Sequence, residues 1–408
     1  MNRLEFIRAR RFVIQLGKTM HEYGTPSHRL EHILIETTHL LGLRGSFLVT
    51  PTSMSFIFWE QGSDDEYTHI ARVNPNGLDL NRLARTHELV EDVLAGRATL
   101  DEGLERITQI RILDDPYPRW LEFLAWGGTS ACFAVLCHAG LYDILASLLA
   151  GWLAFGLAQL TKRYTRFEEM LEPLVALLIA FVGSGVAAMG IPLDVPIVVL
   201  SGIIVFIPGL SLTMGLRELA ARHLSSGTAR IMDASMMLFR LYFGTAFGLA
   251  LGDLLWGLVE YNNTAFLSHA SAQYLAVMGL SISLLIIFKI SHRDAVWGLL
   301  AGIIAYAGSL LGNSLFRHDL GGFAGAMILG LYANTYAQKR NTPTHIVLLP
   351  GIVLLVPGSK VYVGLSTMMT GETVLVDAAS ASQVFMSFMS IVAGLVFANV
   401  ILPPKQRL

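Results

Sequence analysis

Long apolar segments separated by short polar loops dominate the chain after residue 118. A helix of about 20 mostly apolar residues is long enough to cross a bilayer. The pattern predicts ten such spans, at Trp120–Ala139, Tyr142–Leu160, Leu171–Gly190, Val195–Leu212, Ala234–Val259, Tyr274–Ile290, Ala295–Leu311, Phe323–Tyr336, His345–Val356 and Ala379–Leu402. The expected fold class is therefore an α-helical integral membrane protein.

The first 118 residues follow a different pattern, in which shorter helical and strand signals alternate. Apolar residues at helical spacing predict helices at Phe6–Tyr23, His32–Leu41, Leu80–Leu94 and Leu100–Ile112, with Ser27 as the cap of the second. Runs rich in β-branched and aromatic residues predict strands at Phe47–Val49, Met54–Trp59 and Tyr67–Val73. Residues 1–118 are thus expected to form a small α+β domain ahead of the membrane part.

The membrane part contains an internal repeat. Ile197–Leu216 and Ile346–Leu365 align without a gap, and nine of their twenty positions are identical. Chance matching in an apolar chain would give about two. Asp143–Phe155 and Asp294–Tyr306 also align, sharing the Asp, a Leu-Leu-Ala-Gly run and a later Ala.

These matches predict two repeats of five spans each, residues 119–265 and 266–408. Because five is odd, the second copy must enter the bilayer in the opposite orientation. The repeats are therefore expected to be inverted, as in many secondary transporters.

Composition and charge support the membrane assignment. The 408 residues are 53% hydrophobic and 15% charged, and 30 of the 60 charges lie in residues 1–118. The net charge of −2 and the lack of a basic block argue against a nucleic-acid partner. We expect no cleaved signal peptide at the start, and we interpret Cys132 and Cys137 as buried thiols.

Basic residues in the loops predict the orientation, because short cytoplasmic loops are enriched in Lys and Arg. With a cytoplasmic N-terminal domain, two basic residues fall in outer loops, Arg317 and Lys360. Twelve fall in inner loops and the tail: Lys162, Arg163, Arg166, Arg217, Arg222, Arg230, Lys289, Arg293, Lys339, Arg340, Lys405 and Arg407. Both termini are expected in the cytoplasm.

A Pro-Gly pair interrupts each copy of the repeat, at Pro208-Gly209 and at Pro357-Gly358. Proline removes a backbone donor and glycine relaxes the chain, so each helix should break there. Broken helices at matching positions of two halves point to a transporter binding site. The predicted substrate contacts are the four break residues together with Ser211, Thr213, Ser359, Lys360 and Tyr362. The alternative is that Pro-Gly only ends two short helices at loops.

Ionisable residues inside spans are costly and therefore candidates for function. Asp253 and Arg240 in the fifth span are the candidates for proton coupling, although Asp253 would equally fit an outer interface. Asp143 and Asp294 stand at the beginnings of spans, where capping explains them. Asn334 and Asn399 are expected to hydrogen-bond between helices.

The N-terminal domain carries a group of metal-ligating residue types, His21, Glu22, His28, Glu31 and His32. Their spacing does not match the HExxH pattern, and we interpret them as solvated or capping residues, with no metal or other cofactor. A hydrolase or a sensor built on this domain and anchored by the spans is an alternative of another class. No nucleophile with a paired base at a recognisable spacing supports the hydrolase.

The series Tyr23-Gly-Thr-Pro-Ser-His-Arg-Leu-Glu31, followed by Leu41-Gly-Leu43 and Pro51-Thr52, resembles the N-terminal signature of the threonine/serine exporter family. The Pro-Gly repeats resemble the membrane halves of that family, here fused in one chain. The resemblance covers essentially the whole length. It implies export of L-threonine and L-serine across the inner membrane by proton antiport, without enzymatic activity.

No GxxxxGK[ST] motif occurs, which argues against ATP as the energy source. The expected partners are a small-molecule substrate, protons and the lipid bilayer, and an oligomer is possible. A small dicarboxylate such as succinate is the alternative substrate, because these residues do not separate it from an amino acid.

Overall fold

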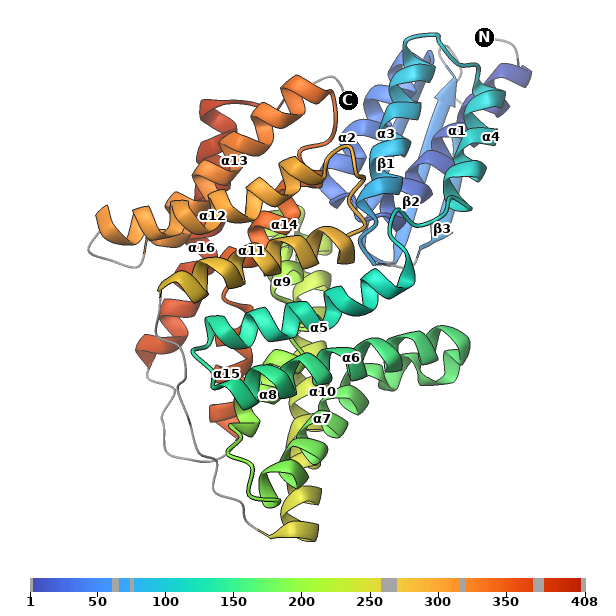
Figure 1. Ribbon diagram of the computed structural model, residues 1–408. Helices are drawn as coiled ribbons and strands as arrows, with labels where there is room; N and C mark the ends of the chain where they lie inside the picture. The colour runs from blue at the N-terminus through green and yellow to red at the C-terminus, as the bar shows by residue number, and fades with distance from the viewer. Residues whose placement is uncertain are drawn as a thin grey trace.

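A computed structural model describes residues 3–60, 66–73, 77–257, 270–315, 320–369 and 378–404 (Figure 1). Helices make up most of the molecule, and a small sheet lies at one end, beside the N-terminus. Arg317, Lys405 and Arg407, which the orientation count includes, lie outside the described residues. So does the expected boundary between the repeats at residues 265 and 266.

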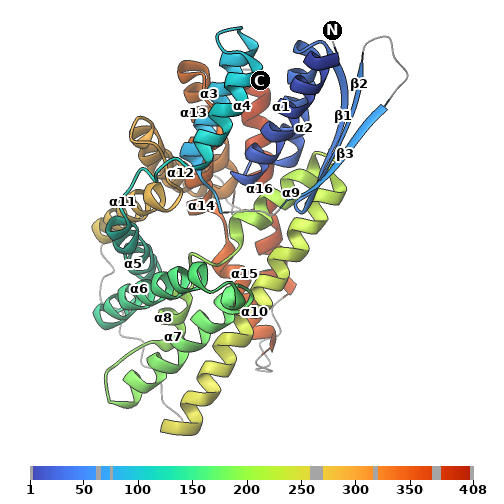
Figure 2. The same ribbon diagram turned by 90° about the vertical axis from the view of Figure 1, so that its right-hand side faces the viewer.

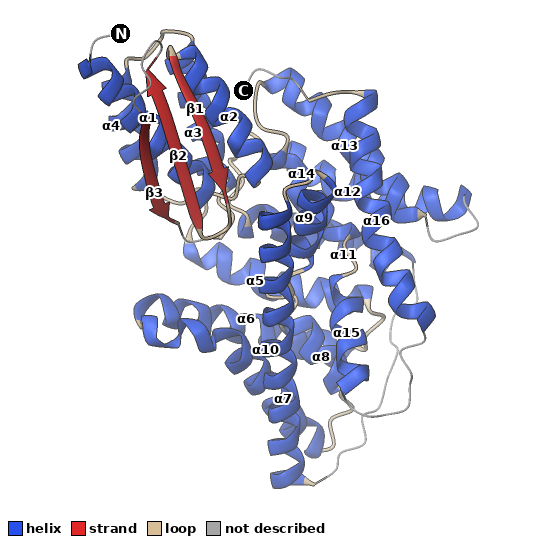
Figure 3. Ribbon diagram, turned by 180° about the vertical axis from the view of Figure 1, so that it is seen from behind, coloured by secondary structure: helices blue, strands red, loops and turns tan. Residues whose placement is uncertain are grey.

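The N-terminal part contains four helices and three strands. The helices are α1 (Arg3–Glu22), α2 (Ser27–Leu40), α3 (Leu80–Leu94) and α4 (Leu100–Arg111). The strands β1 (Leu43–Val49), β2 (Ser53–Glu60) and β3 (Glu66–Arg72) form an antiparallel sheet in the order β1-β2-β3. Figure 3 shows the strands side by side along the edge of this part, with the helices packed behind them.

Alternation of side chains explains how the sheet is buried. Met54, Phe56 and Phe58 on β2 are buried, while the residues between them keep part of their surface accessible. Phe47 pairs with Phe56 across β1 and β2, and the inward face packs on Phe12 of α1. The three predicted strands are confirmed. β1 begins four residues earlier than predicted because pairing with β2 extends through a stretch of weak strand propensity.

Two sets of helices follow in matching order. The first set is α5 (Arg119–Leu136), α6 (Leu141–Arg163), α7 (Leu171–Ala188), the pair α8 (Val195–Gly202) and α9 (Gly209–Ala220), and α10 (Leu224–Trp256). A short 3₁₀ turn, η1 (Thr165–Met170), precedes α7. The second set is α11 (Ala270–Ile287), α12 (Ala295–Leu315), α13 (Gly321–Arg340), the pair α14 (His345–Leu355) and α15 (Gly358–Met369), and α16 (Ala378–Ile401).

The third and fifth helices make an equivalent contact in the two sets. The third helix of each set packs most extensively on the fifth, α7 on α10 and α13 on α16. The first helices, α5 and α11, pack against each other between the sets. Figure 2 shows α11 and α5 stacked above α6 at one side of the molecule.

The lengths of the helices bear on the predicted number of spans. Among the described residues, five helices are long and apolar enough to cross a membrane, or six if α14 and the first part of α15 form one bent span. The broken helices have only 8 to 12 residues each, and a span needs about 20, so neither half of a pair can cross alone. The protein is therefore integral to a membrane, while the count of ten stays a prediction.

The N-terminal part is attached to the loop between α11 and α12. Backbone amides of Leu80 and Asn81 donate to the carbonyls of Phe288 and Lys289, which follow α11, at 3.1 Å each. Arg293 pairs with Glu88 at 3.0 Å. Contacts of this kind hold the N-terminal part beside the ends of several membrane helices.

Candidate functional site

The two Pro-Gly breaks meet in space. A Cβ atom added at Gly209 would lie 3.1 Å from the Cα of Gly358 and 2.7 Å from a methyl group of Val356. A Cβ atom added at Gly358 would lie 3.0 Å from the Cα of Gly209 and 3.1 Å from a methyl group of Ile207. Only glycine lets the two backbones approach this closely. We call this contact between Gly209 and Gly358 the glycine junction.

Each glycine of the junction is also the first residue of a helix, α9 or α15. The amides of the first turn of a helix have no partner within that helix, and the helix dipole is positive there. Pro208 and Pro357 stand directly before these glycines. The preceding helix α14 ends two residues before Pro357, and α8 ends at Gly202, six residues before Pro208. The axes of α14 and α15 differ by 42° across the break. Two positive helix ends from the two sets therefore converge at one buried point.

The other predicted contacts are distributed unevenly around the junction. Ser211 and Ser359 keep part of their surface accessible within the first turn of each helix. The hydroxyl of buried Thr213 donates to the carbonyl of Gly209 at 3.0 Å. The hydroxyl of buried Tyr362 pairs with that of Thr245, on α10, at 2.6 Å. Lys360 is exposed.

The structure thus keeps Ser211 and Ser359 available to a solute beside the breaks. Thr213 and Tyr362 form hydrogen bonds within the protein, and Lys360 is exposed. The role of Thr245 was not visible in the sequence because it lies 117 residues from Tyr362. These placements leave the assignment of the substrate contacts a prediction.

The two candidates for proton coupling are not brought together. Arg240 lies 3.9 Å from Glu172 of α7, and its side chain is 45% exposed. Asp253 is partly exposed in the last turns of α10. They are 13 positions apart in α10, which places the two side chains about 20 Å apart along the helix. They do not form a pair, so any role in proton movement would belong to each separately.

A cavity of about 580 Å³ opens between the N-terminal part and helices α5, α6 and α11. Its wall carries charges of both signs, among them Glu22, Arg111, Glu122 and Lys162. Trp126 of α5 lines the cavity and packs against Phe206, two residues before Pro208, at 5.6 Å between ring centroids. The cavity therefore approaches the first break and is separated from it by aromatic rings.

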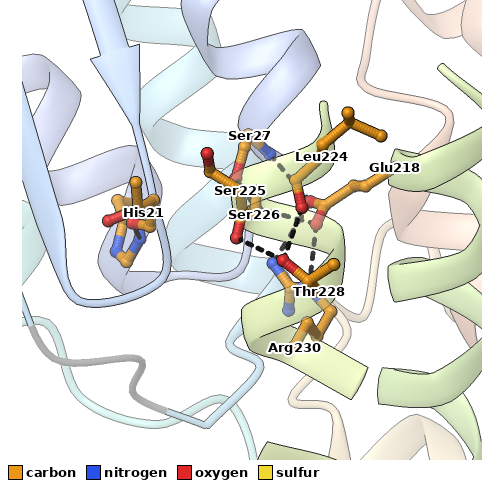
Figure 4. A network of polar contacts seen from close by, with 9 residues as sticks. His21, Ser27, Glu218, Leu224, Ser225, Ser226, Thr228 and Arg230 are labelled. Atoms are coloured by element: carbon orange, nitrogen blue, oxygen red, sulfur yellow. Dashed lines mark hydrogen bonds and ion pairs between the residues drawn. The ribbon is translucent and has the colours of Figure 1, made fainter. Parts of the chain in front are cut away.

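A buried carboxylate attaches the N-terminal part to α9 and α10 (Figure 4). Glu218 is 1% exposed and accepts hydrogen bonds from the amide of Ser27 at 3.2 Å and the hydroxyl of Ser226 at 2.8 Å. It also accepts from Arg230 at 3.3 Å. The hydroxyl of Ser27 pairs with that of Ser226 at 2.6 Å. The prediction that Ser27 caps α2 is wrong, because tertiary contact takes its hydroxyl and Pro26 is the residue at the cap.

Three of the suspected metal ligands contact other groups of the protein. Nε2 of His21 contacts the carbonyl of Thr50 at 3.1 Å, and one oxygen of Glu31 accepts from the amide of Val49 at 2.9 Å. His32 lies 3.5 Å from Glu36. Within the described ranges, no three His, Cys, Asp or Glu side chains are arranged to hold a metal ion.

Burial sets the protonation of histidines in the N-terminal part. Desolvation lowers the pKa of His28 to about 4, assisted by the nearby positive charge of Arg217. It also lowers the pKa of His87 to about 4, with Arg29 adding to the effect. Both rings are therefore neutral at pH 7.

Two side-chain predictions in the membrane part are confirmed. The amide of Asn334 donates to the side chain of Asn399 at 2.9 Å, joining α13 to α16. Asp143 accepts from the amide of Gly140 at 2.9 Å at the beginning of α6, and also from the amide of Asp194 at 2.7 Å. For Asp294 the expected cap is not seen at Oδ1, which is buried without a hydrogen-bond partner.

Paired broken helices and long apolar helices define an integral membrane protein with a buried contact between its two halves. Comparison with known families is more specific. Residues 11–252 match the family described as "Putative threonine/serine exporter", and residues 272–401 match "Threonine/Serine exporter, ThrE". The chain belongs to the threonine/serine exporter family, with both halves fused.

Two of the curated relatives are fungal proteins named as membrane proteins. Pheromone-regulated membrane protein 10 of Candida albicans is 25% identical over 93% of this chain and 36% of its own length. The protein of the same name in Saccharomyces cerevisiae is 26% identical over 86% of this chain and 46% of its own length. The chain spans less than half of these relatives. No solved structure matches the chain.

Proposed function

We propose that this protein is a secondary exporter of small polar amino acids, L-threonine and L-serine, driven by proton antiport. Membership of the exporter family supports transport rather than enzymatic activity. The observation that carries the proposal is the glycine junction, where the first turns of α9 and α15 meet. Helix starts favour anions, so this point suits the carboxylate of an amino acid.

The proposal includes ten membrane crossings in two inverted repeats, preceded by a cytoplasmic α+β domain of residues 1–118. Matching helix order and matching contacts in the two sets support the repeats. Loops that the basic residues predict to be cytoplasmic lie together beside the N-terminal part. Lys162 lines the cavity with Glu22, Glu218 binds Ser27, and Phe288 binds Leu80. We place this side in the cytoplasm, at the inner membrane.

In this proposal the cavity of about 580 Å³ receives the solute from the cytoplasm. Its charges of both signs suit a zwitterion, which carries an ammonium and a carboxylate. Movement of Trp126 and Phe206 would then open the way to the first break. Asp253 and Arg240 are retained as separate candidates for proton coupling.

Flux from loaded proteoliposomes tests the proposal. Vesicles with an imposed proton gradient should release labelled L-threonine and L-serine, and an uncoupler should abolish the gradient-dependent part. Unlabelled threonine and serine should compete with the labelled solute, and succinate should not. Flux that persists unchanged with the uncoupler would contradict proton antiport. Competition by succinate alone would show that the substrate is a dicarboxylate and not threonine or serine.

A further inference from the structure

Four basic side chains lie where the N-terminal part meets the membrane helices; one of them, His345, is buried, and the others keep part of their surface accessible. His28 and Arg29 lie in the first turn of α2, Arg217 lies near the end of α9, and His345 begins α14. Arg29, Arg217 and His28 all act electrostatically on His345. Figure 3 shows α2, α14 and α9 converging at this level. We call Arg217, His345 and His28 the basic cluster.

The basic cluster contains buried nitrogen atoms that no group in the described part of the chain satisfies. Nη1 of Arg217 and Nε2 of His345 are buried without a hydrogen-bond partner among the described residues, and so is Nδ1 of His28. His345 is only 2% exposed. A buried polar group without a hydrogen bond is costly, most of all when it is charged. The unpartnered nitrogen of the Arg217 guanidinium therefore indicates a binding partner from outside the chain.

Neighbouring acids do not supply that partner. Glu218, the next residue after Arg217, already binds Ser27, Ser226 and Arg230. Within the described part of the chain, no ion pair reaches Arg217 at 4 Å or less. Arg217 as a whole keeps part of its surface accessible, while its Nη1 is buried.

The charge and the donors of the cluster limit the kind of anion. The low pKa of His28, caused chiefly by burial, keeps that ring neutral at pH 7. Glu36 acts electrostatically on Arg29. Nδ1 of His345 lies 3.5 Å from the hydroxyl of Thr344. When Nδ1 accepts a hydrogen bond from this hydroxyl, the ring proton is on Nε2, which is then a donor. One unpaired guanidinium with neutral imidazole donors fits a monovalent anion better than a phosphate dianion.

We propose that Arg217, His345 and His28 bind the carboxylate of a small organic molecule. Arg217 lies eight residues after Gly209, about 12 Å along α9 from the glycine junction. The site therefore occupies the end of α9 beside the N-terminal part. The carboxylate comes either from the exported amino acid, in which case the inference rests on the proposed function, or from a separate cytosolic acid.

Thermal unfolding of the full chain in detergent tests the site at constant ionic strength and pH 7. The probes are L-threonine, acetate and 1-amino-2-propanol, which is threonine without its carboxylate. A carboxylate that binds the folded protein should raise the melting temperature saturably, and 1-amino-2-propanol should not. Stabilisation by threonine at concentrations at which acetate has no effect identifies the solute as the source. Equal effects of acetate and threonine identify a separate acid.

Variants assign the binding to the cluster. Arg217→Gln should weaken carboxylate binding by about tenfold or more and should raise the melting temperature without ligand, because it removes an unpaired buried charge. Arg217→Lys keeps the charge but loses the planar fork, so weaker binding is expected even if the first variant fails to fold. His345→Gln should also weaken binding. The control Arg222→Gln, an exposed arginine just after α9, should bind as the unmodified protein does.

The inference is overturned if no carboxylate stabilises the unmodified protein, or if both Arg217 variants bind the carboxylate normally. The outcome is separable from that of the proposed function. Normal threonine export with unaltered carboxylate binding by the Arg217 variants rejects the site alone. Carboxylate binding that depends on Arg217, in a protein that exports neither threonine nor serine, rejects the proposed function alone.

Discussion

The glycine junction and the Glu218 network both join distant parts of the chain, but by opposite means. At the junction, Gly209 and Gly358 meet backbone to backbone, with no side chain between them. At the network, one carboxylate that is 1% exposed binds three groups from α2 and α10. The first contact relies on shape and the second on charge and hydrogen bonds.

This difference suggests different tasks. The contact between Gly209 and Gly358 has no side-chain hydrogen bonds, so little free energy is needed to separate the two backbones. This suits a point that opens and closes during transport. A buried and fully bonded carboxylate is expensive to separate, because each freed group would lack a partner. We therefore expect the junction to govern flux and the network to hold the N-terminal part in place.

The largest effect is expected from Gly358→Ala. Its new methyl group would lie 3.0 Å from the Cα of Gly209, so backbone must shift. Overpacking of this kind costs about 1–3 kcal/mol, and a cost of ~1.4 kcal/mol on the rate-limiting step is a tenfold loss. Threonine efflux should therefore fall by about tenfold or more.

Gly156→Ala is the matched control, because the added methyl group on α6 would meet no atom within 4 Å. Its flux should match that of the unmodified protein. Equal threonine efflux by Gly358→Ala and Gly156→Ala would show that transport does not depend on the close approach of Gly209 and Gly358.

An effect on stability rather than on flux is expected from Glu218→Gln. The change leaves the partly buried Arg230 without its anion and should cost about 3 kcal/mol of unfolding free energy. Denaturant unfolding and limited proteolysis between residues 1–118 and the membrane part measure it. Glu105→Gln, an exposed residue of α4, is the control. Unchanged stability in Glu218→Gln would mean that other contacts alone attach the N-terminal part.

The smallest effect is the dependence of stability on pH through His87. Its pKa is lowered from 6.5 to about 4 in the folded protein, chiefly by burial. The unfolded state binds the proton first as pH falls, so this stability is present above pH 6.5 and is lost toward pH 4. Between pH 7.5 and 5 the loss amounts to about 2 kcal/mol.

His87→Gln should flatten the profile of stability against pH over this interval, while His39→Gln, at an exposed position, should leave it unchanged. An identical slope in His87→Gln and the unmodified protein would refute the assignment.

Local signals in the sequence predict much of this molecule. Pro-Gly pairs in a duplicated segment locate both helix breaks, and their duplication suggests that they face one another. The strands of the N-terminal part follow from runs rich in β-branched and aromatic residues, such as Phe56, Ile57 and Phe58 of β2. Asn334 and Asn399 stand out because amides are rare among apolar neighbours. In each case the cause lies within a few residues of the effect.

Contacts between distant segments were not predictable in this way. The Thr245 hydroxyl that bonds Tyr362 and the Ser27 amide that bonds Glu218 depend on how whole helices pack. Ser27 illustrates the point, since its local context favours a cap and tertiary contact overrides it. Arg240 and Asp253 appear together as polar residues of one helix, but their spacing along α10 keeps them apart.

The central claim is that a solute binds beside the glycine junction, between the first turns of α9 and α15. The most direct measurement is thiol labelling of Ser211→Cys and Ser359→Cys, each in a chain with Cys132→Ser and Cys137→Ser, with and without saturating L-threonine. The account predicts that threonine slows labelling at both positions and leaves the exposed Lys360→Cys unchanged. Labelling rates at both serine positions that do not respond to threonine would contradict it.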